Sequence, residues 1–243
     1  FTIFVDETEA NITNEAPYIA PSPVSVVLVI DWSVSEQDVI DDIQAAAKDF
    51  IGQLVTSGNG DEVVICKFHK EIEFNTDYGD QFYSVDNQAD VTAMEDYIDD
   101  LSFSFASATY LYDAMYKAIT RAAEGSKTKQ VVVVLSDGVD YGSEDHTLQQ
   151  VTDYSIQKKV PVFTIYYRDP AYQGGDYGDP NTLWQLSDGT GGQDYDGMTS
   201  GLTDVYAKIA SAISNKYVIK LTVPGGCIQG STVPVVVGAG GPR

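Results

Sequence analysis

The sequence predicts an α/β fold with a doubly wound, mostly parallel central sheet, helices on both faces and a small terminal β extension. Two observations predict it. Short apolar runs rich in β-branched residues recur along the chain, as expected of buried parallel strands. Between these runs, apolar residues repeat with the 3.6-residue period of amphipathic helices. Strands that alternate with helices favour a parallel sheet with right-handed connections.

Four apolar runs are predicted to be buried parallel strands: residues 24–30, 62–68, 130–135 and 161–166. Residues 71–74 follow the second run after a very short link, so they are predicted to be one antiparallel edge strand. Residues 192–195 form a weaker last strand. Helical periodicity fills the intervals, with apolar faces at 39–54, 94–101, 111–122, 148–156 and 202–213.

The two ends of the chain do not follow this alternation. Residues 2–5, 217–223 and 233–237 read as extra strands. We therefore predict an N-terminal β extension and linker over residues 1–23, an α/β domain over 24–215 and a C-terminal β extension over 216–243. The start at Phe1 shows no signal-peptide pattern, which favours a processed protein or an excised segment.

Composition limits the partners. The 243 residues carry a formal net charge of −22. A nucleic-acid backbone or an anionic membrane needs a positive protein surface, so neither is an expected partner. No apolar stretch approaches the length of about 20 residues that spans a bilayer, and no membrane insertion is expected.

The chain has two cysteines, Cys66 and Cys227. Two cysteines give neither a disulfide framework nor a metal-ligand spacing. Cys66 lies in a predicted buried strand, where a free thiol behaves as a small apolar side chain. A free Cys66 is the expectation, and a Cys66–Cys227 disulfide is the alternative.

Oxygen-bearing side chains follow the predicted strands. Asp31, Ser33 and Ser35 come directly after the first strand, Thr109 precedes the third helix, and Asp137 follows the third parallel strand. The carboxyl ends of parallel strands meet at one edge of the sheet, where ligands bind. Carboxylates and hydroxyls are hard ligands that suit Mg²⁺, with Mn²⁺ or Ca²⁺ as substitutes. These five residues are the predicted metal ligands.

The mixture of ligands indicates binding and not bond breaking. Neutral hydroxyls do little to reduce the charge of a divalent cation, so the ion keeps its attraction for one further anionic oxygen. A Glu or Asp of a partner can supply that oxygen. Helix N-termini after Ser35 and Thr109 also favour negative charge at this edge.

Each element also has an ordinary structural interpretation. Ser33 and Glu36 fit a capping box, Thr109 fits a plain N-cap, and Ser136-Asp137-Gly138 fits a turn. Each interpretation is reasonable when taken alone. Their joint occurrence, in this order and on these strand ends, favours a metal site.

On these elements, residues 24–215 resemble the von Willebrand factor type A family, which includes the inserted domains of integrins. The resemblance implies a metal-ion-dependent adhesion site (MIDAS), with Asp31, Ser33 and Ser35 in its first loop, Thr109 in its second and Asp137 in its third. It also implies that the last helix, about residues 199–214, can shift when ligand binds. Val34 and Ser107-Ala108 replace glycines often found in the family, which leaves the ligands in place and can stiffen the loops.

Aromatic residues flank the three loops. We predict that Trp32, Tyr110 and Tyr141 form a rim that contacts the ligand, with partial burial as the alternative. The polar segment 168–181 carries Asp169, Asp176 and Asp179. A solvated loop is the expected structure there, because the spacing of the three aspartates is not that of an EF-hand. A second cation site is the alternative.

The expected function is that of a metal-dependent adhesion module of a secreted or cell-surface protein. Its ligand is a protein or other extracellular partner that offers a carboxylate, and the chain is expected to be part of a larger multidomain adhesin or pilus-like protein. A scaffold for subunit assembly with an incidental metal is one alternative. A phosphatase-like hydrolase is another, but Ser33 stands where that class normally has its acid, so no catalysis is expected.

Overall fold

A computed structural model of the protein describes residues 2–5, 8–12, 18–75, 82–100, 108–171, 178–218, 221–222 and 235–238. The chain divides into two compact units. Residues 22–214 form the larger unit, and residues 1–21 together with 215–243 form the smaller one. The predicted α/β fold is confirmed in the larger unit.

A seven-stranded sheet runs through the larger unit in the order β10-β9-β8-β4-β5-β6, with the short β7 also paired to β5. Its parallel strands are β4 (Val24–Asp31), β5 (Glu62–Phe68), β8 (Lys129–Ser136), β9 (Val162–Tyr166) and β10 (Asp194–Asp196). Antiparallel to β5 run β6 (Ile72–Phe74) and β7 (Tyr83–Ser84). Each predicted strand of this sheet is confirmed with small changes at its ends. The sequence does not predict β7, because so short a strand shows no period.

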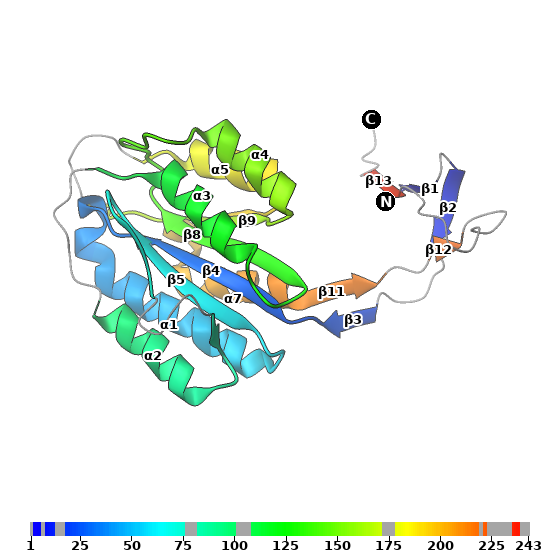
Figure 1. Ribbon diagram of the computed structural model, residues 1–243, viewed down its shortest axis with the longest axis horizontal. Helices are drawn as coiled ribbons and strands as arrows, with labels where there is room; N and C mark the ends of the chain where they lie inside the picture. Colours follow the sequence, from blue (N-terminus) through cyan, green and yellow to red (C-terminus); the bar gives the residue numbers. More distant parts are fainter. Residues whose placement is uncertain are drawn as a thin grey trace. The chain divides into compact units, whose positions relative to one another are not determined.

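Helices cover both faces of the sheet (Figure 1). One face carries α1 (Ile40–Ser57), α2 (Gln88–Asp99) and α7 (Leu202–Ser214). The opposite face carries α3 (Leu111–Ala122), α4 (Leu148–Lys158) and α5 (Pro180–Thr190). A 3-10 helix, η1 (Val34–Val39), leads into α1, and the single turn α6 (Gly197–Ser200) precedes α7.

The central strand β4 explains why its sequence is apolar without interruption. Val26, Leu28 and Ile30 pack in the core beneath α1 and α7, whereas Val27 and Val29 pack in the core beneath α3. Successive side chains of a strand point to opposite faces, so a strand covered on both sides must be apolar at every position. Each such aliphatic side chain contributes about 1.5–3 kcal/mol by its burial.

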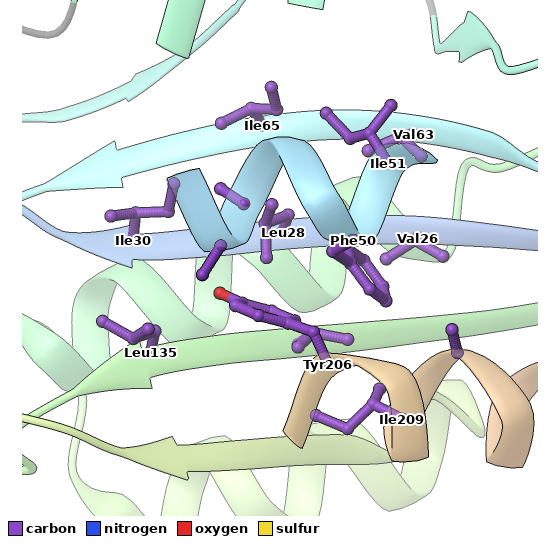
Figure 2. Packing of buried hydrophobic residues seen from close by; sticks show 14 of the residues in the cluster. Val26, Leu28, Ile30, Phe50, Ile51, Val63, Ile65, Leu135, Tyr206 and Ile209 are labelled. Atoms are coloured by element: carbon purple, nitrogen blue, oxygen red, sulfur yellow. The ribbon is translucent and has the colours of Figure 1, made fainter. Parts of the chain in front are cut away.

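Aromatic packing joins α1 and α7 over this sheet. Figure 2 shows Phe50 of α1 and Tyr206 of α7 lying against β4 residues such as Leu28, and the two ring centroids are 5.0 Å apart. Both side chains have no exposed area. The core therefore fixes α1, which continues directly from η1.

Helix α5 corrects the interpretation of segment 168–181. The helix begins at Pro180, inside the stretch expected to be a solvated loop. Asp179 caps it by accepting hydrogen bonds from the backbone N–H groups of Asn181 at 3.1 Å and Thr182 at 3.2 Å. Asp169 is only 5% exposed, so it is not solvated either. Asp176 lies outside the described residues, and a second cation site there stays the alternative.

The smaller unit brings the two ends of the chain together. Its four-stranded sheet has the order β12-β2-β1-β13, from β12 (Leu221–Thr222), β2 (Thr8–Ile12), β1 (Thr2–Val5) and β13 (Val235–Gly238). A separate antiparallel pair joins β3 (Tyr18–Pro21) to β11 (Asn215–Val218). The predicted terminal strands are confirmed, although residues 217–223 contain parts of two strands. Cys66 is buried and free, and Cys227 lies outside the described residues.

Candidate metal-binding site

Asp31 is the last residue of β4 and is fully buried. Its Oδ1 accepts a hydrogen bond from the backbone N–H of Ser33 at 3.0 Å, and its Oδ2 accepts one from the Ser136 hydroxyl at 2.7 Å. The parallel register of β4 and β8 pairs Ile30 with Leu135, so the next residues along both strands emerge side by side. The sheet thus fixes the orientation of this carboxylate.

The two serines of the first loop lie in contact. The hydroxyl oxygens of Ser33 and Ser35 are 2.8 Å apart, and Ser33 is 3% exposed. Ser33 occupies the N-cap position of η1 but its side chain makes no capping hydrogen bond. Neither oxygen of Glu36 meets a hydrogen-bond partner in the part of the chain that the structure describes. The capping-box alternative is therefore wrong, and both hydroxyls face each other beside Asp31.

Asp137 follows the end of β8 and is 5% exposed. Its Oδ1 accepts a hydrogen bond from the backbone N–H of Val139 at 2.9 Å, so the expected turn is present. Gly138 has a φ of +82°, and a Cβ there would lie 2.2 Å from the backbone oxygen of Asp179. Only glycine fits this turn, which holds Asp137 against the start of α5.

Thr109 reaches the same edge through backbone pairing. Its N–H donates to the Tyr141 carbonyl at 3.1 Å and its carbonyl accepts from the Tyr141 N–H at 2.8 Å. The next residue, Tyr110, donates to the carbonyl of His69, just beyond β5, at 2.9 Å. Thr109 is not an N-cap, because Tyr110 holds that position of α3. The loop that follows Asp137 therefore carries Thr109 beside the ends of β5 and β8.

The aromatic rim is only partly possible. Trp32 is 1% exposed and belongs to the core, so the prediction that it contacts a ligand is wrong for this structure. Tyr141 is 63% exposed, and Tyr110 is half-buried. A rim of Tyr110 and Tyr141 stays a prediction.

The electrostatics of the site favour a bound cation. The pKa of Asp31 is raised to about 7, first by burial and then by the nearby charge of Asp137, while the hydrogen bonds from Ser136 and Ser33 act to lower it. Two carboxylates that repel each other in this way are stabilised by a positive charge between them. Opposite charge supplied from outside the chain would relieve this repulsion.

Glu36 is the site residue that the sequence prediction misses. It has no exposed area, and burial raises its pKa to about 10, helped by the charges of Asp31, Asp137 and Asp169 and opposed by Arg168. A detectable pattern exists, because Glu36 precedes Ile40 and Ile43 by four and seven positions and so continues their apolar face. Burying an acidic side chain on an apolar helix face is costly, so such a residue in the sequence indicates a position that deserves inspection.

The donors present fit a hard divalent cation. The five predicted ligands offer carboxylate and hydroxyl oxygens, and such ligands suit Mg²⁺, Mn²⁺ or Ca²⁺. Across the described residues, no three acidic, histidine or cysteine side chains are arranged to hold an ion by themselves. A cation here must therefore use the serine and threonine hydroxyls as well as the carboxylates.

Comparison with known families decides the classification. The family model of the von Willebrand factor type A domain matches residues 25–195. The chain belongs to the von Willebrand factor type A family. The match contains Asp31, Ser33, Ser35, Thr109 and Asp137. A search of curated proteins finds no similar sequence.

Solved structures share the fold of this type A domain. The von Willebrand factor type A protein from Catenulispora acidiphila is 16% identical with a TM-score of 0.57, and the match covers 78% of this chain and 42% of that one. The pilus adhesin SpaC from Lactobacillus rhamnosus GG is 15% identical, with a TM-score of 0.56 and coverage of 88% and 34%. The type V pili tip protein Mfa5 from Porphyromonas gingivalis is 12% identical, with a TM-score of 0.59 and coverage of 82% and 50%.

These three chains are longer than the type A domain described here, which spans half of their length or less. Identities this low show a common fold and nothing finer. Among the helices in the described residues, none is both long and apolar enough to cross a membrane.

Proposed function

We propose that this type A domain binds an acidic group of a partner through a divalent cation held by Asp31, Ser33, Ser35, Thr109 and Asp137. One observation carries the proposal. Asp31 is buried beside Asp137, and the hydroxyls of Ser33 and Ser35 lie 2.8 Å apart next to it. Mg²⁺, Mn²⁺ or Ca²⁺ would neutralise the two carboxylates and accept both hydroxyls.

The cation would supply attraction for one further anionic oxygen, and the chain's own residues would orient it. The Ser136 hydroxyl and the backbone N–H of Ser33 hold the Asp31 carboxylate in one orientation. Ser33 also stands where a phosphatase of the aspartyl type needs its acid. Binding, and not catalysis, is the function that these residues support.

The fold relatives support a place at a cell surface. Their names include a pilus adhesin and a pilus tip protein. We extend this to the chain as a proposal: it is a module of a larger secreted or surface-displayed protein that adheres to an extracellular partner. The alternative, a subunit-assembly scaffold with an incidental metal, predicts association that persists after chelation.

Calorimetric titration of the purified chain with Mg²⁺, Mn²⁺ and Ca²⁺ tests the metal, with Thr109→Ala as the variant. We expect binding of at least one ion by the wild type and binding at least tenfold weaker in the variant. No heat with any ion contradicts the proposal. For the open position, the water relaxation rate of the Mn²⁺ complex is followed as acetate is added, with acetamide as the neutral control. Only acetate should displace the coordinated water.

A further inference from the structure

Helix α3 begins without a cap of its own. Its N-cap residue is Tyr110, whose side chain makes no capping hydrogen bond. The first N–H groups of a helix have no partner within the helix and must be satisfied from elsewhere. Here the loop between β8 and α4 satisfies them. The Tyr112 N–H donates to Asp140 Oδ1 and to Ser143 Oγ, both at 3.1 Å. The Asp113 N–H donates to Ser143 Oγ at 3.2 Å, so a distant loop caps this helix.

Asp113 binds the same loop in the opposite direction. Its Oδ2 accepts hydrogen bonds from the backbone N–H groups of Glu144 at 3.0 Å and Asp145 at 3.5 Å. Its Oδ1 accepts from the backbone N–H of His146 at 2.9 Å, and His146 Nδ1 lies 2.8 Å from the same oxygen. Burial would raise the pKa of Asp113, but these hydrogen bonds outweigh it and the pKa is lowered. We call the side chains of this mutual contact the α3 clasp: Asp113, Asp140, Ser143 and His146.

Ring stacking extends the α3 clasp to the neighbouring helix. The His146 ring stacks on Tyr116 of α3 with the ring centroids 3.8 Å apart, and Tyr116 stacks on Tyr154 of α4 at 4.1 Å. Helices α3 and α4 lie side by side on one face of the sheet (Figure 1). His146 also directly precedes Thr147, the N-cap of α4. The loop is therefore fixed to both helices.

The fixed loop connects two of the predicted ligands. It begins after Asp137, and its residue Tyr141 exchanges two backbone hydrogen bonds with Thr109, at 3.1 and 2.8 Å. Thr109 itself lies two residues before the start of α3. A loop released from α3 would therefore change the position of Thr109 relative to Asp137. No member of the α3 clasp is one of the five predicted ligands.

We propose that Asp113 is a positioning residue of the cation site, which through the α3 clasp holds Thr109 and Asp137 at the separation that one ion requires. This inference rests on the proposed function. The Asp113 carboxylate already accepts hydrogen bonds from three backbone N–H groups, so its part in the site is indirect. Residues that orient the ligands of an ion contribute to affinity although they do not touch it.

Asp113→Ala tests the inference with two measurements. The affinity for the ion that the wild type binds most tightly, measured by calorimetry, should fall at least fivefold. Amide hydrogen exchange of the metal-free protein, followed by NMR, reports on the loop itself. Exchange at the N–H groups of Thr109 and Tyr141 should accelerate at least tenfold more than exchange at the amides of β4. A residue with a general structural role would not single out these two amides.

Asp90→Ala is the matched control. Asp90 is the third residue of α2, as Asp113 is the third residue of α3, and its Oδ2 accepts the Ser84 N–H at 2.9 Å. Ser84 pairs with Glu62 at the start of β5, which is the opposite edge of the sheet from the site. This variant should keep its cation affinity within twofold and show no selective exchange at Thr109 or Tyr141. An equal loss of affinity in both variants would overturn the inference.

The remaining outcomes are distinguishable. If the wild type binds no ion, the proposed function fails and the inference fails with it. If the wild type binds and Asp113→Ala binds equally well, the inference alone is overturned. Weaker binding without selective exchange at Thr109 and Tyr141 also overturns it, because the loss then has another origin. Asp113→Asn, which keeps the shape but not both acceptor oxygens, is a second variant with the same expected effects. If neither variant folds, Asp113 is a structural residue and the inference is overturned.

Discussion

Two buried glutamates at opposite edges of the central sheet show how differently one fold treats the same side chain. Glu62 begins β5 at the edge where the parallel strands start, and it is 8% exposed. Glu36 lies at the edge where those strands end, and it has no exposed area. Both side chains have little exposed area, and Glu36 is the more deeply buried of the two.

The two carboxylates differ in their hydrogen bonding. The Glu62 carboxylate accepts from the Ser25 hydroxyl at 2.7 Å, the Ser126 hydroxyl at 2.7 Å and the Ser126 N–H at 2.6 Å. Burial alone would raise the pKa of Glu62, but these bonds outweigh it and the pKa is lowered. Glu36 has no such partner within the described residues, and its pKa is raised to about 10. The glutamate at the amino-end edge is therefore satisfied by hydrogen bonds from the protein, whereas the glutamate at the carboxyl-end edge has no such partner among the described residues.

The largest effect expected at the carboxyl-end edge comes from Asp31→Asn. The substitution removes the charge of the most central acidic group and keeps its size, so cation binding should become undetectable, a loss of at least 100-fold. Calorimetric titration with Mg²⁺, Mn²⁺ and Ca²⁺ measures it. Retained cation binding in Asp31→Asn would show that the carboxyl-end edge does not bind the ion through Asp31. Asp61→Asn at the opposite edge is the control and should leave cation affinity unchanged.

At the amino-end edge the main effect should be on stability. Glu62→Gln replaces an acceptor of three hydrogen bonds by an amide whose NH₂ group cannot accept them. We expect the free energy of unfolding at pH 7 to fall by about 1–3 kcal/mol, which is typical of a lost charged hydrogen-bond acceptor. Urea denaturation of both proteins measures the change. A difference below about 0.5 kcal/mol would mean that these bonds contribute little.

The same pair should show a defined pH dependence. The folded protein lowers the pKa of Glu62 below its usual value of 4.5, so the ionised form is favoured by folding. The added stability is therefore fully present above pH 4.5 and is lost as the pH falls through the lower pKa of the folded protein. The difference in stability between wild type and Glu62→Gln should shrink on acidification. A constant difference would assign the effect to packing and not to charge.

Much of the larger unit can be predicted from sequence because its strands are short and apolar on both faces. The period of 3.6 also locates α1, α3 and α7 correctly. The sequence analysis does not predict helix α5, because a Gly-rich and Asp-rich segment precedes it. Asp179-Pro180 is nevertheless a typical helix start, and Gly191 is a typical helix end. How the two termini pair in the smaller unit depends on contacts between distant residues, which local patterns do not encode.

The candidate site shows a similar limit. The order Asp31, Ser33, Ser35, Thr109 and Asp137 can be read from the sequence because each residue follows or precedes a predictable element. Burial of individual side chains cannot be read in the same way. Trp32 follows a strand end, and its sequence position favours a place in the rim or partial burial, but its ring packs in the core. The capping-box alternative would place the Glu36 side chain at the helix start, but its position on the apolar face of η1 and α1 buries it.

The smallest effect should follow Tyr141→Ala. The Tyr141 side chain is 63% exposed, whereas its backbone forms the two hydrogen bonds that hold Thr109. Removing the ring should therefore change the free energy of unfolding by less than about 0.5 kcal/mol and leave cation affinity within twofold. Ile156→Ala, an exposed apolar residue near the end of α4, is the control. A cation affinity lowered more than tenfold in Tyr141→Ala alone would show that the ring, and not only the backbone bridge, positions the carboxyl-end edge.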